Sequence, residues 1–191
     1  MKEKILFVNS CVRGENESRT LALAKIALSR LDGDIEEIRR ADGDLKPLDA
    51  AGLAKRAESA EKNDFSDPVY DCAKQFAACD TVVIAAPFWD YSFPAFLKIY
   101  IESLCVGGLT FLYGSDGVPI SYCRAKTLIY ITTSGGYIGG TDFGFEYIKT
   151  VTKSFFGIEN FSFFSAEGLD ILGNDPAAIL KAAQEKIERE L

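Results

Sequence analysis

The sequence contains no histidine, one tryptophan and one methionine in 191 residues. Its five cysteines are Cys11, Cys72, Cys79, Cys105 and Cys123, which are widely spaced and include no Cys-x-x-C pair. Because structural zinc sites are built from closely spaced cysteines and histidines, the sequence predicts no metal site. We expect all five cysteines to be reduced and mostly buried as small apolar side chains.

Long apolar segments are also missing, and no run of about 18 apolar residues that could span a membrane is present. The first ten residues lack the apolar core and cleavage site of a secretory signal, which predicts a cytoplasmic protein. Lysine and arginine total 21 against 28 aspartate and glutamate, a formal charge of -7. Since this charge repels nucleic acid and anionic membranes, neither is expected as a partner.

Two common phosphate-binding motifs are absent. The Walker pattern requires a Gly-Lys-Ser/Thr, and the dinucleotide fingerprint requires three glycines where the first loop has only Gly14. Cys11 directly follows the first predicted strand, as in low-molecular-weight tyrosine phosphatases and arsenate reductases. Those families need an arginine six residues later, where this chain has Glu17, whose carboxylate would repel a phosphate. A phosphatase is therefore only a minor alternative.

Short β-rich segments alternate with segments of helical periodicity along the chain. Thr81–Ala86 is apolar throughout, as a parallel strand covered by helices on both faces requires. The length and the 48% hydrophobic content predict one domain, residues 1–191. The alternation of strands and helices predicts a doubly wound α/β fold, which we expect to be of the flavodoxin-like type. Its five-stranded parallel sheet is expected in the order 2-1-3-4-5. The predicted strands are Lys4–Asn9, Ile35–Ile38, Thr81–Ala86, Thr127–Thr132 and Asn160–Ser165, and the predicted helices are Ser18–Leu31, Pro68–Cys79, Pro94–Val106, Asp142–Phe156 and Pro176–Leu191.

Helix starts are marked by Ser18, Asp67 and Asp175, each of which resembles an N-cap, and the latter two precede a proline. Two segments are irregular. We expect a short helix within Arg40–Asp64, and a small strand pair involving Thr110–Tyr113 within Gly107–Ser121.

Ligands of such sheets bind at the carboxyl ends of the strands, near the point where the strand order reverses. The loops that follow the first, third and fourth core strands are Ser10–Ser18, Pro87–Pro94 and Thr133–Gly140. The first of them offers hydroxyl groups and the backbone amides of a helix start, which together favour a phosphate. The alternative is that Ser18 only caps the helix.

The other two loops differ in character. Pro87–Pro94, with the sequence PFWDYSFP, holds four aromatic residues between two prolines and suggests a rigid wall for a flat tricyclic ligand. Its aromatics could instead plug the core. Thr132–Gly140, with the sequence TTSGGYIGG, contains two Gly-Gly pairs that permit close backbone approach to a ligand, although an ordinary turn would look the same.

These residues resemble the FMN-dependent NADH-azoreductase and quinone-reductase family over most of the chain. The strongest segment, Ala85–Gly114, is similar to the family's pattern of proline, a hydrophobic residue, Tyr-Asn-Phe, proline and Leu-Lys before Gly-x-Thr-Phe-x-Tyr. Three departures stand out: Ser134 replaces an arginine, Asp90 an asparagine and Trp89 a tyrosine. The resemblance implies FMN bound by Ser10, Asn16, Glu17, Ser18, Pro87, Phe88, Trp89, Asp90, Tyr91, Thr133, Ser134, Gly135 and Gly136.

The same resemblance implies an enzyme that passes two electrons from NADH or NADPH through FMN to a quinone, an azo compound or a nitroaromatic. A small planar acceptor would replace the nicotinamide in a ping-pong cycle, with no catalytic acid or base among the side chains. The resemblance also implies a homodimer, which the apolar and aromatic segment Leu109–Tyr122 favours. Two alternatives are a flavodoxin-type electron carrier, whose Thr/Ser-x-Thr-Gly-x-Thr loop is absent, and a flavin-binding protein without turnover.

Overall fold

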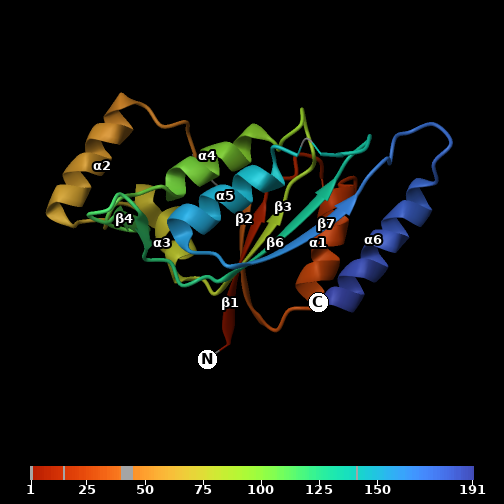
Figure 1. Cartoon of the computed structure of the whole chain (residues 1–191), viewed down its shortest axis with the longest axis horizontal. Helices are drawn as coiled ribbons and strands as arrows, with labels where there is room; N and C mark the ends of the chain where they lie inside the picture. The colour runs from red at the N-terminus through yellow and green to blue at the C-terminus, as the bar shows by residue number, and fades with distance from the viewer. Residues whose placement is uncertain (1, 15, 40–44, 141) are drawn as a thin grey trace.

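The computed structural model describes residues 2–14, 16–39, 45–140 and 142–191 (Figure 1). Its main sheet has five parallel strands in the order β2-β1-β3-β6-β7, which corresponds to the predicted order 2-1-3-4-5 and confirms it. The strands are β1 (Glu3–Asn9), β2 (Gly33–Arg39), β3 (Thr81–Ala85), β6 (Thr127–Thr133) and β7 (Asn160–Ala166).

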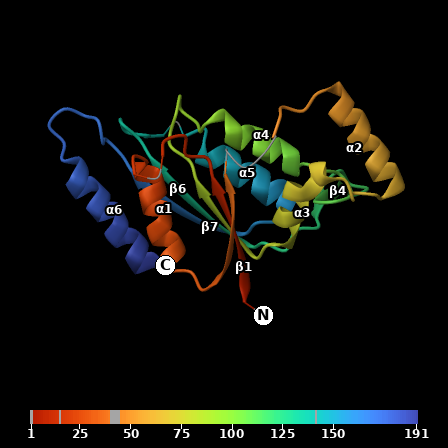
Figure 2. The same cartoon turned by 180° about the vertical axis from the view of Figure 1, so that it is seen from behind.

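Helices cover both faces of this sheet, as Figures 1 and 2 show from opposite sides. Every residue of β3 is buried, as expected for a central parallel strand. Because side chains alternate along a strand, Val82 packs into one core cluster and Val83 into the other. The first cluster includes side chains of α3 (Asp71–Ala78), α4 (Ala95–Leu104) and α5 (Phe145–Phe156), and the second includes those of α1 (Arg19–Ser29) and α6 (Pro176–Glu190).

The three predicted N-caps are confirmed. Ser18 accepts from the backbone amide of Leu21, Asp67 from that of Val69, and Asp175 from those of Ala177 and Ala178. These bonds satisfy amides that have no partner inside the helix.

Two helices begin differently from the prediction. Pro68–Tyr70 forms the 3-10 turn η2 ahead of α3, because the amide of Tyr70 bonds to the Asp67 carbonyl three residues earlier. Helix α5 begins at Phe145, because the Asp142 carboxylate accepts from the amides of Gly144 and Phe145 and so stays outside the helix.

Both irregular segments contain regular structure. Within 40–64, residues 40–44 lie outside the described residues, and α2 (Ala50–Lys62) has 13 residues, more than the short helix expected. None of its residues is buried, and it projects from the body of the molecule (Figure 1, orange). The strands β4 (Phe111–Tyr113) and β5 (Pro119–Ser121) pair antiparallel, which confirms the expected strand pair.

The described part of the chain contains no helix of the length and apolarity needed to cross a bilayer. All five cysteines lie in that part as free thiols. Cys79 and Cys123 are buried, and the other three are partly buried.

Two buried tyrosines provide a test of the core. The Tyr100 hydroxyl has no hydrogen-bond partner among the described residues, whereas the Tyr70 hydroxyl donates to Ser59 Oγ at 3.0 Å. Removing an unsatisfied buried hydroxyl relieves a desolvation cost, and removing a bonded one loses about 1 kcal/mol. We expect Tyr100→Phe to leave the free energy of unfolding unchanged or raise it by about 1 kcal/mol, and Tyr70→Phe to lower it. Equal losses in urea denaturation would contradict this assignment.

Candidate functional site

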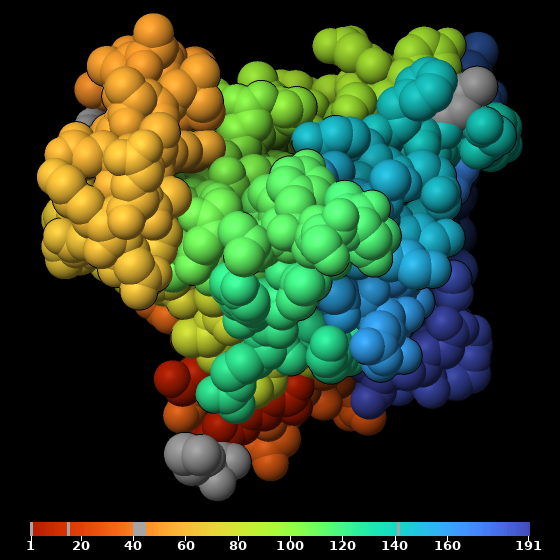
Figure 3. Space-filling view, turned by 60° about the vertical axis from the view of Figure 1, so that its left-hand side comes forward, coloured from red at the N-terminus to blue at the C-terminus, as the bar shows by residue number. Residues whose placement is uncertain are grey.

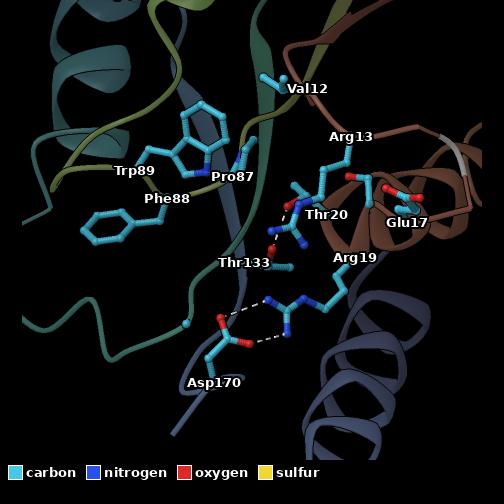
Figure 4. Close-up of a pocket in the computed structure, with 12 residues that line it drawn as sticks. Val12, Arg13, Glu17, Arg19, Thr20, Pro87, Phe88, Trp89, Thr133 and Asp170 are labelled. Atoms are coloured by element: carbon cyan, nitrogen blue, oxygen red, sulfur yellow. Dashed lines mark hydrogen bonds and ion pairs between the residues drawn. The ribbon is translucent and has the colours of Figure 1, made fainter.

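A cavity of about 200 Å³ lies where the start of α1, the segment after β3 and the end of β6 meet (Figure 4). These are the three loops that the sequence singled out. A fourth segment, the loop after β7, contributes one side chain. The cavity is lined by Val12, Arg13, Glu17, Ser18, Arg19, Thr20, Pro87, Phe88, Trp89, Thr133, Gly135 and Asp170.

The start of α1 can receive an anion. Ser18 accepts from the amide of Leu21, and its own amide donates to the carbonyl of Gly14. The amides of Arg19 and Thr20, the first two helical residues, have no acceptor within the helix. Together with the positive end of the helix dipole, they make this end of α1 a candidate anion seat. Ser18 thus caps the helix and also lines the cavity.

Two buried contacts form the base of the site. The hydroxyls of Thr20 and Thr133 lie 2.6 Å apart and join α1 to the end of β6. Both the backbone amide and the hydroxyl of Ser10 donate to the carbonyl of Ala85 at 3.0 Å. Ser10 is fully buried and does not line the cavity, so it supports the site from beneath.

An apolar wall stands opposite the charged residues. Figure 4 shows Pro87 and the indole of Trp89 across the cavity from Arg13, while the ring of Phe88 points away. Phe88 instead meets Tyr91 edge to face, with ring centroids 6.2 Å apart. The flat surface that faces the cavity therefore comes mainly from Pro87 and Trp89.

The next two residues, Asp90 and Tyr91, form a tight turn and do not line the cavity. Asp90 and Tyr91 have φ angles of 50° and 64°, and the backbones of Trp89 and Ser92 bond to each other on either side. Two consecutive residues with positive φ define a type I′ turn. A tyrosine in this region is strained, and such strain persists where surrounding contacts hold it. Here the amide of Phe143 donates to the Tyr91 carbonyl at 3.0 Å.

The loop after β6 is held by the loop after β7. Three backbone hydrogen bonds of 2.9–3.1 Å join residues 168–170 to residues 134–136. Ser134 is buried, and its hydroxyl donates to the carbonyl of Gly136, so only Thr133 and Gly135 of this loop face the cavity.

Four charged side chains line the cavity, two of each sign. Arg19 forms a bidentate ion pair with Asp170, with N–O distances of 2.9 and 3.2 Å. This contact with Arg19 lowers the pKa of the Asp170 carboxyl below its usual value. Arg13 and Glu17 are exposed and complete the set.

Cys11 does not have the properties of a phosphatase nucleophile. Burial raises the pKa of its thiol above the usual value, and a hydrogen bond with Ser18 only partly opposes this. Reactive cysteines need a lowered pKa and a cationic environment. Because position 17 also holds a glutamate where those phosphatases need an arginine, the structure and the sequence argue against the phosphatase alternative.

Seven of the residues expected at the site line the cavity and six do not. The six are Ser10, Asn16, Asp90, Tyr91, Ser134 and Gly136. The sequence reasoning missed Val12, Arg13, Arg19, Thr20 and Asp170. A signal for Arg19 was present in the sequence. Helices usually carry acidic residues in their first turn, whereas α1 has none there and begins with this arginine.

The threonine pair predicts a pattern of stabilities. Thr20→Val and Thr133→Val each leave a buried hydroxyl without its partner, which costs about 1–3 kcal/mol. The double variant removes both hydroxyls and should unfold within about 1 kcal/mol of the wild type. Urea denaturation of the cofactor-free protein measures all three. Additive losses in the double variant would mean that the two hydroxyls do not depend on each other.

The chain is similar to known proteins over almost its whole length. Residues 3–191 match the Flavodoxin_2 family, described as a flavodoxin-like fold. The chain is 34% identical over 203 residues to FMN-dependent NADH:quinone oxidoreductase 2 of Clostridium acetobutylicum, covering 98% of this chain and 97% of the relative. It is 30% identical to the FMN-dependent NADH:quinone oxidoreductase of Coprothermobacter proteolyticus, covering 97% and 96%.

Solved structures share the fold. An azoreductase from Bacillus anthracis superposes with a TM-score of 0.83 at 21% identity, covering 98% of this chain and 97% of that one. A second B. anthracis structure, an FMN-dependent NADH-azoreductase in complex with FMN, superposes with a TM-score of 0.77 at 22% sequence identity. The match covers 98% of this chain and 96% of that one. The match over almost the whole chain confirms the resemblance found in the sequence: the chain belongs to the Flavodoxin_2 family and is a relative of FMN-dependent NADH:quinone oxidoreductases.

Proposed function

We propose that this protein is an FMN-dependent oxidoreductase that takes a hydride from NADH or NADPH and passes two electrons to quinones, azo compounds or nitroaromatics. The observation that carries the proposal is the convergence of an anion seat at α1 and a flat apolar wall at Pro87 and Trp89 on one cavity. The relatives named as FMN-dependent NADH:quinone oxidoreductases support the same chemistry.

The residues of the cavity fit FMN. The amides of Arg19 and Thr20, with the guanidinium groups of Arg13 and Arg19, suit the terminal phosphate, which would lie next to Ser18 and Glu17. Pro87 and Trp89 provide a surface on which an isoalloxazine can stack. Gly135 has no side chain to obstruct the approach, whereas Ser10 and Ser134 hold the surrounding loops. Asn16, Asp90, Tyr91 and Gly136 would then border the cofactor rather than enclose it.

Bound FMN supplies the electron chemistry, since it accepts a hydride and releases electrons to a second substrate. The chain positions the flavin, shields one of its faces with the apolar wall and leaves the other accessible. None of the side chains is assigned as a catalytic acid or base. A flavodoxin-type carrier and a flavin-binding protein without turnover share the cavity but would not oxidise NADH or NADPH steadily.

Turnover with a quinone separates these functions. Purified protein should contain one FMN per chain and oxidise NADH or NADPH continuously with menadione. Because donor and acceptor use the same exposed flavin face in turn, double-reciprocal plots at several fixed menadione concentrations should be parallel. A single stoichiometric reduction without turnover would indicate a carrier. Intersecting lines with several quinones would mean that both substrates bind together.

We also propose that residues 1–191 act as one domain, that the protein is cytoplasmic and that it forms a homodimer. Support for the dimer comes from the hairpin of β4 and β5, which lies centrally on the face shown in Figure 3, between α2 and α5. Five of its apolar side chains are about half exposed, an unusual cluster for a solvated surface. They are Leu112, Tyr113, Val118, Ile120 and Tyr122.

The dimer predicts the effect of a charge on this hairpin. Wild-type protein at micromolar concentration should sediment at twice the chain mass of 20.9 kDa. Ile120→Asp buries a carboxylate at the proposed interface and should give the monomer, whereas Ile35→Asp on the edge strand β2 should not. A wild-type monomer, or dissociation by both variants alike, would contradict an interface at the hairpin.

A further inference from the structure

The loop after β7 places a carboxylate at the anion seat. Asp170 binds the guanidinium of Arg19 through both of its oxygens, and Arg19 is the first residue of α1. A cation at that position is unfavourable, because it adds to the positive end of the helix dipole. Asp170 offsets this cost by supplying a negative charge from a part of the chain 151 residues away.

The position of Asp170 is held by its surroundings. Its amide donates to the carbonyl of Gly135 at 2.9 Å, and a Cβ on Gly135 would lie 2.5 Å from its carboxylate oxygen. Gly168 has a φ of 75°, which favours glycine, and its carbonyl accepts from Asn174 Nδ2. The carboxylate therefore reaches Arg19 because two glycines permit the turn and the close approach.

We propose that Asp170 is a built-in competitor of the FMN phosphate for Arg19. This inference rests on the proposed function and concerns how tightly the cofactor binds. The phosphate dianion and the Asp170 carboxylate seek the same guanidinium at the mouth of the same cavity. Without cofactor, Asp170 neutralises Arg19; with cofactor bound, the phosphate shares or takes over the guanidinium while the carboxylate repels it.

The proposal assigns opposite effects to one charge. Asp170 stabilises the cofactor-free protein, because it pairs with a cation at a helix start. It weakens FMN binding, because its negative charge lies next to the phosphate site. A residue that only oriented Arg19 toward the phosphate would strengthen FMN binding instead. Removing the charge therefore distinguishes competition from positioning.

The test compares dissociation constants of FMN and riboflavin, measured by quenching of flavin fluorescence at low salt. Riboflavin lacks the phosphate but shares the ring. Asp170→Asn should bind FMN about five- to tenfold more tightly than the wild type, the size expected for a charge interaction through partly solvated surroundings. Its affinity for riboflavin should be unchanged, and the gain for FMN should shrink in 0.5 M salt.

Three variants control this comparison. Asp34→Asn removes an exposed carboxylate that pairs with Lys2 at the opposite end of the sheet and should leave FMN affinity unchanged. In an Arg19→Gln background the further change Asp170→Asn should give a much smaller gain, since the competition acts through Arg19. Asp170→Ala keeps the backbone bonds and repeats the test if the amide variant folds poorly.

Thermal unfolding provides a second readout. Cofactor-free Asp170→Asn should melt below the wild type, and saturating FMN should raise its Tm by a larger interval. Unchanged or weaker FMN binding by Asp170→Asn and Asp170→Ala would overturn the competition, as would an equal gain for riboflavin. If the wild type itself fails to bind FMN, the proposed function fails and the inference fails with it.

Discussion

The junction between the ends of β1 and β3 determines where the candidate site can be. Ser10 closes this junction with two hydrogen bonds to the single carbonyl of Ala85. Beyond this junction the segments that follow β1 and β3 separate, and one leads to α1 while the other leads to Pro87 and Trp89. Since the strand order reverses at this point, no further strand fills the space between them, and a crevice remains. The end of β6 supplies the third side through the bond between the amide of Phe88 and the carbonyl of Thr133.

The features that the sequence predicted well depend on neighbours in the chain. The caps at Ser18, Asp67 and Asp175 bond to amides two or three residues away, so the local pattern contains both partners. The buried strand β3 could be predicted because its residues form an almost uninterrupted apolar run. The contacts that complete the site join distant residues: Thr20 meets Thr133 across 113 positions and Arg19 meets Asp170 across 151. No local pattern specifies such pairs, because they depend on how the finished sheet aligns its loops.

The aromatic loop shows a second limit of sequence reasoning. The composition of the run from Phe88 to Tyr91 predicted a flat wall at the site. The type I′ turn at Asp90 and Tyr91 nevertheless directs those two side chains away from the cavity, and Phe88 turns toward Tyr91. Only Pro87 and Trp89 keep the predicted orientation (Figure 4). The amino-acid composition of a loop indicates which kind of ligand it favours, but the φ angles of its turn decide which of its side chains face that ligand.

The cavity separates charge from apolar surface, and this separation divides the tasks of its residues. Arg13, Glu17, Arg19 and Asp170 gather at the start of α1, where the phosphate of the proposed cofactor would lie and stay. Pro87 and Trp89 stand where one face of the flavin ring would stack, so that nicotinamide and acceptor would meet the opposite, exposed face in turn. Changes at the charged end should therefore alter how long the cofactor is retained, and changes at the apolar wall should alter how the flavin ring is held. Because the charges of these four residues cancel, the loss of any one of them would change the net charge that the phosphate meets.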